Sequence, residues 1–148
     1  ISEFSIKLFN FMRPDDVNIN SAISDSENEI SFYYQKKLSQ LSTIKKNIST
    51  ERMQGKIKEK KIKSFTLNSV LKNSKFKGKQ IDFLNIDVEG ADFEALRSLD
   101  FKTYNPKIIC IEIMEKNILN SKTFNFLKNL SYKKVWSSKS EFNHIFSK

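Results

Sequence analysis

The most informative hydrophobic pattern in the chain is the run over residues 81–88, where apolar side chains fill most positions. A run of this length predicts a parallel β-strand that is covered on both faces. Two carboxylates, Asp87 and Glu89, stand at its carboxyl end. Because ligands of open α/β sheets bind outside the carboxyl ends of the strands, this end of the run is the first candidate for a functional site.

A second unit of the same kind follows directly. Residues 90–99 predict a helix, because they place apolar side chains at near-helical spacing, namely at Phe93, Leu96 and Leu99. The apolar residues 108–113 then predict a second buried strand, which ends near Glu112. Two β-α units therefore lie in series, with acidic side chains at both strand tips.

The remaining elements follow from periodicity and from capping residues. Residues 36–56 fit either an amphipathic helix or a loop, because apolar spacing and serine content point in different directions. No repeat or long linker divides the chain, which predicts one domain. Further helices are predicted over residues 4–12, which Pro14 ends, over 67–72 with Thr66 as N-cap, and after Ser121; strands are predicted over 17–24 and 29–34.

At this point the sequence resembles a known family. The letters IDFLNIDVEGADFEALRSL, followed by PKIICIEI, are similar to the signature of the FkbM family of S-adenosylmethionine-dependent methyltransferases. Upstream, NINSAISDSENEISFYY and KSFTLNSVL also resemble the family, and residues 132–138 and 142–147 resemble its closing antiparallel strands. The resemblance covers roughly residues 17–147. Two positions depart from it, since Asn85 replaces a common lysine and Asn68 a common aspartate.

The resemblance implies an α/β fold, a partial Rossmann-like class I methyltransferase with a mostly parallel sheet, antiparallel closing strands and flanking helices. The only glycines are Gly55, Gly78 and Gly90, which lie too far apart to form a glycine-rich nucleotide loop. We therefore expect residues 1–148 to be a single partial methyltransferase domain, without the amino-terminal half that holds the cofactor. Such a carboxyl-terminal part of a longer enzyme is expected to be inactive by itself.

The resemblance also assigns roles at the strand tips. It implies S-adenosylmethionine as cofactor, with adenine contacts near Ala22 and Ile23, and O-methylation of a sugar or another small polar acceptor. Asp87 and then Glu89 are the candidate catalytic residues, because a carboxylate can orient an acceptor hydroxyl and take its proton. Glu112 is the candidate on the substrate side. Carboxylates are the ligands of hard cations, so a divalent metal held by Asp87, Glu89 and Asp92 is conceivable, but no metal-loop spacing is present and no metal is predicted.

Each of these carboxylates also has a structural explanation. Asp87 and Glu89 precede a helix, where acids stabilise the amino-terminal dipole by about 0.3–1 kcal/mol without any chemistry. His144, the only histidine, lies in the last predicted strand and is expected to be structural. The alternative to an enzyme is accordingly a non-catalytic remnant of a methyltransferase.

Composition places the chain among globular proteins. Hydrophobic residues make up 39% of it, including 13 Phe, which is enough for a core. The single cysteine, Cys110, cannot form an internal disulfide, and no apolar run approaches the ~18 residues of a membrane helix. These features predict a cytoplasmic protein without a membrane segment, whose oligomeric state stays open.

The net charge of +9 is concentrated in one segment. Residues 36–79 hold 14 Lys and Arg against 2 acids, a net +12, while the remainder carries −3. Such a segment could attract nucleic acid. However, only 3 of the 26 basic residues are Arg, the residue that binds phosphate and guanine in bidentate fashion. A solvated lysine surface is therefore preferred, and no nucleic-acid partner is expected.

Overall fold

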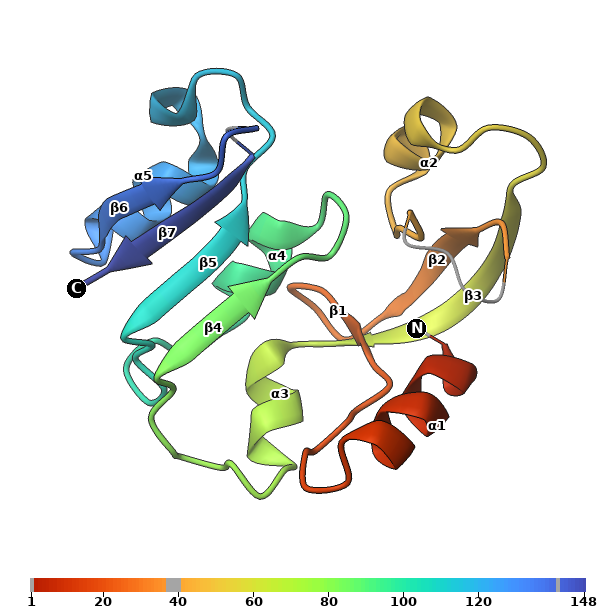
Figure 1. The fold of residues 1–148 in the computed structure, drawn as a ribbon, viewed down its shortest axis with the longest axis horizontal. Coiled ribbons are helices and arrows are strands. Elements are labelled where there is room, and N and C mark those ends of the chain that lie inside the picture. The colour runs from red at the N-terminus through yellow and green to blue at the C-terminus, as the bar shows by residue number, and fades with distance from the viewer. Residues whose placement is uncertain (1, 37–40, 141) are drawn as a thin grey trace.

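The computed structural model describes residues 2–36, 41–140 and 142–148, which form two mixed β-sheets flanked by helices (Figure 1). The elements, in chain order, are α1 (Glu3–Met12), β1 (Ala22–Ile23), β2 (Glu29–Tyr34), α2 (Lys46–Arg52), β3 (Lys58–Phe65), α3 (Leu67–Lys72), β4 (Phe83–Ile86), α4 (Asp92–Arg97), β5 (Ile108–Glu112), the 3-10 helix η1 (Ile118–Asn120), α5 (Lys122–Asn129), β6 (Lys133–Ser137) and β7 (Asn143–Ser147).

The sheets are mixed rather than mostly parallel, so that part of the predicted fold is wrong. One sheet has the order β1-β3-β2 and the other the order β4-β5-β7-β6. Among the described strands, only β1 with β3 and β4 with β5 pair in parallel, whereas β2 with β3, β5 with β7 and β6 with β7 are antiparallel. The antiparallel strands expected at the end of the chain are present as β6 and β7.

The antiparallel pairing in the three-stranded sheet arises from β3, a strand that the hydrophobic pattern does not predict. Its sequence KEKKIKSF has hardly any apolar side chains, and its lysines are exposed. Backbone pairing with β2 along six residue pairs, from Glu29↔Lys63 to Tyr34↔Lys58, holds it in the sheet. Lys60 lies 5.5 Å from the ring centre of Phe32, so its stem and charge cover an aromatic side chain.

The main core lies on one face of the four-stranded sheet. Strands β4, β5 and β7 contribute Ile86, Ile109, Ile111 and Phe146, and helices α4 and α5 cover these with Leu96 and Leu127. Full burial of one such side chain stabilises the fold by about 1.5–3 kcal/mol. The core therefore fixes β4 and β5 side by side and aligns their carboxyl ends.

The other face of this sheet is open, which corrects the prediction that the strand within residues 81–88 is covered on both faces. Phe83 is 56% exposed and Ile108 is 40% exposed, and both lie on the face opposite the core. The reason is that α4 and α5 both pack on the same side. Among the described strands, β4 pairs only with β5, so its outer edge is also open.

Helix α1 forms as predicted, with Ser2 as its N-cap, but none of its residues is buried. Most of its apolar side chains are exposed, and Phe11 is the extreme at 81%. The strand predicted over residues 17–24 shortens to Ala22–Ile23. Within residues 36–56 the helical alternative is confirmed only over Lys46–Arg52, and residues 37–40 lie outside the described residues.

Helices α3 and α5 begin after Thr66 and Ser121, as the capping pattern predicts. Each cap side chain accepts a backbone N–H of the first helical turn, which satisfies a donor that the helix itself cannot pair. In the described part of the chain, no helix has the length and apolar character to cross a membrane.

Candidate functional site

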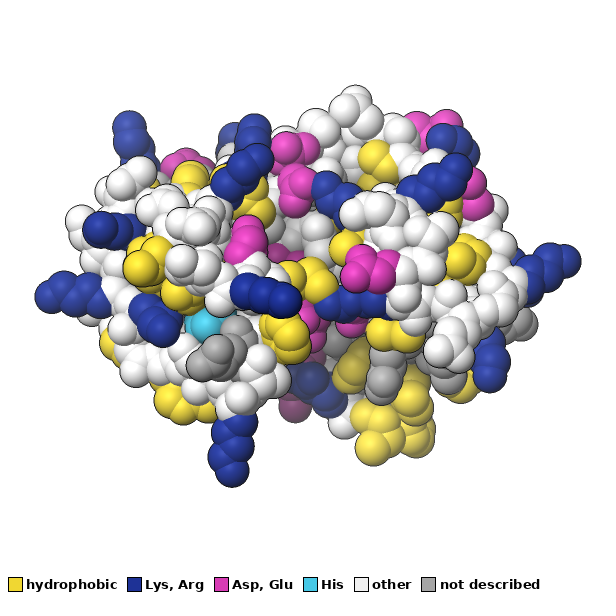
Figure 2. Space-filling view, turned by 90° about the horizontal axis from the view of Figure 1, so that it is seen from above, with side chains coloured by type: hydrophobic (Ala, Val, Ile, Leu, Met, Phe, Trp, Pro, Cys, Tyr) yellow, Lys and Arg dark blue, Asp and Glu magenta, His cyan; other side chains and the backbone are white. Residues whose placement is uncertain are grey.

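A cavity of about 570 Å³ lies between the two sheets, where β1 approaches the carboxyl end of β4. Its volume falls within the range of roughly 300–1,000 Å³ that small-molecule sites occupy. Seen from above the strand tips, Asp and Glu side chains gather around the hollow between the two halves of the molecule (Figure 2). The lining residues are Ser21, Ala22, Ile23, Phe32, Ser42, Thr43, Ile44, Asp87, Val88, Glu89 and Ala91.

The turn between β4 and α4 brings the acids to this cavity. Asp92, which is 5% exposed, accepts the backbone N–H of Val88 at 3.1 Å and of Gly90 at 3.0 Å. Glu89 and Gly90 both have positive φ, at 53° and 89°, so the turn is left-handed over two residues. The buried carboxylate thus replaces missing backbone partners and holds Asp87 and Glu89 beside the cavity.

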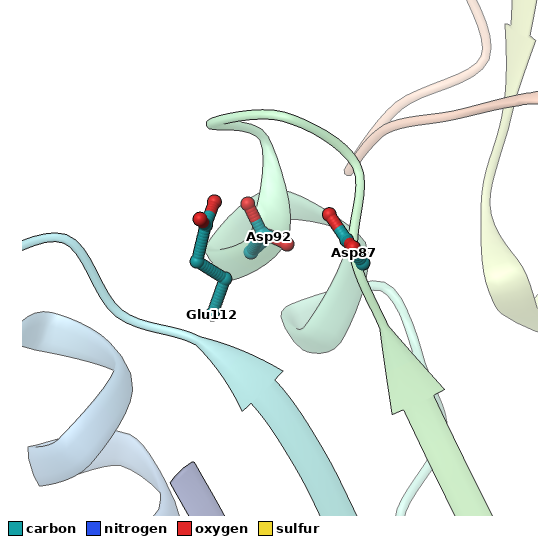
Figure 3. Close-up of side chains that lie close together, drawn as sticks. All are labelled: Asp87, Asp92 and Glu112. Atoms are coloured by element: carbon teal, nitrogen blue, oxygen red, sulfur yellow. The ribbon is translucent and has the colours of Figure 1, made fainter. Parts of the chain in front are cut away.

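Three carboxylates meet at the tips of β4 and β5 (Figure 3). Oxygens of Asp87, Asp92 and Glu112 lie within 4.8 Å of one another. Burial raises the pKa of Asp92 to about 6, because the charged form loses its hydration. Burial also raises the pKa of Glu112, and the negative charge of Asp92 adds to the effect. Within the described structure, the buried Oε2 atom of Glu112 has no hydrogen-bond partner.

The two acids predicted at the end of β4 differ in their surroundings. Glu89 forms an ion pair with Arg52 at 2.9 Å. Asp87 is exposed, and no described residue forms a hydrogen bond or ion pair with it. Of the two, Asp87 has the carboxylate that is available to a bound molecule.

The structure brings most of the predicted site residues together. Ala22 and Ile23 line the same cavity as Asp87 and Glu89, although they lie more than sixty residues apart in sequence. Glu112 lies outside the lining but belongs to the cluster of three carboxylates. His144 is buried, and its Nδ1 lies 2.9 Å from Ser137 Oγ on the neighbouring strand, an arrangement typical of a structural histidine.

Sequence reasoning did not reveal the structural roles of three residues of the site. Asp92 shapes the turn, but its burial is visible only in three dimensions. Thr43 donates to the Glu89 carbonyl at 2.7 Å, and Arg52 binds the Glu89 carboxylate. Both lie in the stretch whose pattern fits either a helix or a loop, so no local signal could assign them.

Carboxylate oxygens at this spacing are the kind of ligand that a hard divalent cation takes. The set that comes together contains Glu112 in place of Glu89, whose carboxylate binds Arg52. Both oxygens of Asp92 already accept backbone N–H groups. The cluster is therefore explained first by the turn that Asp92 stabilises.

Comparison with known proteins identifies the family. The sequence model described as the Methyltransferase FkbM domain matches residues 3–134. No curated protein and no solved structure matches the chain. The matched residues include the cavity lining, the β4–α4 turn and Glu112, and they make up most of the chain. The protein therefore belongs to the FkbM methyltransferase domain family.

Proposed function

We propose that this domain transfers a methyl group from S-adenosylmethionine to a hydroxyl of a sugar or another small polar metabolite. The observation that carries the proposal is the cavity that joins Ala22 and Ile23 to Asp87 and Glu89. It places an apolar wall opposite carboxylates at the end of a parallel strand, the usual position of ligands in α/β folds. Membership of a methyltransferase family supports the reaction class.

The lining suits one part of the cofactor. Ala22, Ile23 and Val88 offer an apolar surface for the adenine ring, and the hydroxyl of Ser21 offers a polar contact. No glycine-rich turn lies among the described residues that could approach the remainder of the cofactor. The residues present therefore fit the adenine end of S-adenosylmethionine, and none of the described residues is assigned to bind the remainder of the cofactor.

We propose that further strands, from outside these 148 residues, complete the cofactor site. Two strand edges support this idea, because among the described strands β1 pairs only with β3 and β4 pairs only with β5. Both open edges belong to strands with parallel partners, and both strands border the cavity. Unpaired backbone N–H and C=O groups along a strand favour the addition of another strand.

The bound cofactor would supply an electrophilic methyl group on a sulfonium centre, with the thioether S-adenosylhomocysteine as the leaving group when the S–CH3 bond breaks. Asp87 would accept a hydrogen bond from the acceptor hydroxyl, orient its oxygen toward that methyl group and take the proton as the new C–O bond forms. Glu89 and Asp92 hold the turn on which Asp87 lies. Glu112, one strand away, would contact the acceptor from the side of β5.

The first test is Asp87→Asn in the complete protein, assayed for methyl transfer from labelled S-adenosylmethionine. Asparagine keeps the size of the side chain but cannot take a proton, so we expect kcat to fall by about 10²- to 10⁴-fold. The matched control is Asp82→Asn, because Asp82 is exposed and pairs with Lys107 at the opposite end of β4.

Undiminished turnover of Asp87→Asn would remove the assigned role of Asp87. A complete protein that binds no S-adenosylmethionine would instead support the non-catalytic alternative.

A further inference from the structure

One segment of the chain connects the three-stranded sheet to the site, and we call residues 43–52 the α2 arm. At its start, Thr43 pairs with Tyr33 of β2 through two backbone hydrogen bonds of 2.8 and 3.1 Å. The Thr43 hydroxyl donates to the Glu89 carbonyl at 2.7 Å. The arm is therefore anchored on one sheet and bonded to the strand-tip turn of the other.

The middle of the arm packs on the same turn. Ile48 approaches the position that a Cβ of Gly90 would occupy to 3.1 Å. Lys45 forms an ion pair with Glu94 in the first turn of α4. Polar and apolar contacts of the arm thus both fall on residues 89–94.

The arm ends at Arg52, whose guanidinium spans two strand tips. Its Nη1 atom lies 2.9 Å from Glu89 Oε2, after β4, and its Nη2 atom lies 3.5 Å from Met114 Sδ, after β5. Both side chains of the ion pair are largely buried, with 29% of Arg52 and 23% of Glu89 exposed. A planar guanidinium with several N–H donors suits such a bridging position.

The charges around Arg52 are mainly negative. Asp87 at the tip of β4, Glu89 in the turn, Asp92 in α4 and Glu112 in β5 all face this region. Burial and Asp92 raise the pKa of Glu112, and the positive charge of Arg52 opposes them. Among the described ion pairs, that of Arg52 is the one made with these four acids, since Lys45 pairs with Glu94.

We propose that Arg52 is a positioning residue of the methyl-transfer site, which holds Glu89 in the left-handed turn and thereby fixes Asp87 beside the cavity. This inference rests on the function proposed above. Glu89 needs such support, because a residue with a side chain rarely adopts a φ of 53°. Arg52 binds the carboxylate of Glu89 and Thr43 binds its backbone carbonyl, so both the side chain and the backbone of Glu89 are held.

The kinetic test uses Arg52→Gln, Arg52→Lys and the control Arg13→Gln in the complete protein. Arg13 forms an exposed ion pair with Asp16 next to α1, and neither residue lines the cavity, so its loss removes the same charge elsewhere. We expect Arg52→Gln to lower kcat by about 10- to 100-fold with little change in the KM for the cofactor. Arg52→Lys should restore part of the rate because it keeps the charge.

A second readout needs no cofactor. Carboxyl-carbon NMR of the isotope-labelled protein follows the titration of Glu112, whose pKa should rise further in Arg52→Gln and stay unchanged in Arg13→Gln. Equal kcat per folded molecule in Arg52→Gln and in the unaltered protein, or an unaltered Glu112 titration, would overturn the inference. If Arg52→Gln does not fold, Glu89→Gln breaks the same ion pair from the other side and should give the same loss of kcat.

The two readouts separate the possible failures. Absence of methyl transfer in the unaltered protein would count against the proposed function, whereas an unchanged Glu112 titration would count against the role of Arg52.

Discussion

The individual residues of the site fall into those that the sequence pattern predicts and those that only packing reveals. Asp87 and Glu89 are predictable, because the end of a buried strand is where α/β folds bind ligands. Asp92 is not, because its function is to accept two backbone N–H groups inside the protein. Nothing in the order of residues distinguishes a buried aspartate of this kind from an exposed acid in the first turn of a helix.

The buried carboxylate of Asp92 makes stability depend on pH in a particular direction. Its pKa of about 6 lies above the ordinary value near 3.8, so the folded protein binds a proton more tightly than the unfolded chain. The resulting stabilisation is fully present below about pH 4 and is lost as pH rises through 6, by about 3 kcal/mol at most. We expect Asp92→Asn to remove this slope in urea unfolding measured between pH 4 and 7.

The matched control is Asp100→Asn, because a solvent-exposed hydrogen bond from the Thr103 hydroxyl lowers the pKa of the Asp100 carboxyl. Its contribution is present at neutral pH and is lost as pH falls below its ordinary pKa, the opposite sense to Asp92. The burial argument would be contradicted if the free energy of unfolding changed with pH in the same way for Asp92→Asn and the unaltered protein between pH 4 and 7.

Gly90 permits a second test at the same scale. A Cβ at this position would combine a φ of 89° with an Ile48 atom at 3.1 Å, whereas Gly78 has a φ of 70° and open space. Strain alone costs about 1–2 kcal/mol, so Gly78→Ala should lose about that much stability and Gly90→Ala clearly more. Equal losses in the free energy of unfolding for Gly78→Ala and Gly90→Ala would show that Ile48 does not pack closely against the turn.

At the scale of elements, prediction succeeds where caps and apolar spacing agree. Helices α3 and α5 begin directly after their predicted caps, Thr66 and Ser121. Prediction fails for β3, because lysines lie on both of its faces. Its sequence therefore shows no alternation of apolar and polar residues. The prediction that β4 is covered on both faces is also wrong, because apolar residues alone do not reveal on which side of the sheet the helices pack.

Helices α5 and α1 should respond differently to loss of their caps. Ser121 is fully buried and accepts from Thr123 and Phe124, and α5 places Leu127 in the core. Ser121→Ala should therefore cost about 1 kcal/mol in the free energy of unfolding. Ser2→Ala, which removes the cap of α1, should leave global unfolding almost unchanged because α1 buries no residue. A larger loss from Ser2→Ala than from Ser121→Ala would show that α1 is part of the cooperative core.

At the scale of the whole molecule, the family could be predicted from the sequence, but the arrangement of the sheets could not. The letters around IDVEG identify the family, and the match over residues 3–134 confirms it. The pairing of β2 with the lysine-rich β3 makes the sheet mixed, and it depends on backbone hydrogen bonds that hydrophobic patterns do not report. The resemblance already placed Ala22 and Ile23 of β1 at the same site as Asp87, but sequence separation hid the approach of the α2 arm to that cavity.

The lysines of the basic segment are also arranged in a way that the sequence alone does not show. Lys58 and Lys60 lie on one face of the β2–β3 ribbon, and Lys61 and Lys63 lie on the other. On the face that Figure 2 shows, Lys and Arg side chains are spread over the outline and the middle of the molecule, and several acids lie around the central hollow. The lysines of β3 are therefore divided between two faces of the ribbon rather than gathered on one.

The measurement that tests the proposed site most directly is photolabelling of the complete protein with S-adenosylmethionine carrying a tritiated methyl group, followed by peptide mapping. The proposal predicts saturable labelling that excess S-adenosylhomocysteine suppresses, with label in peptides that contain residues 21–23, 42–44 or 87–91, the lining of the cavity. Saturable labelling confined to peptides away from this lining, or no binding at all, would contradict the assignment of the cavity to the cofactor.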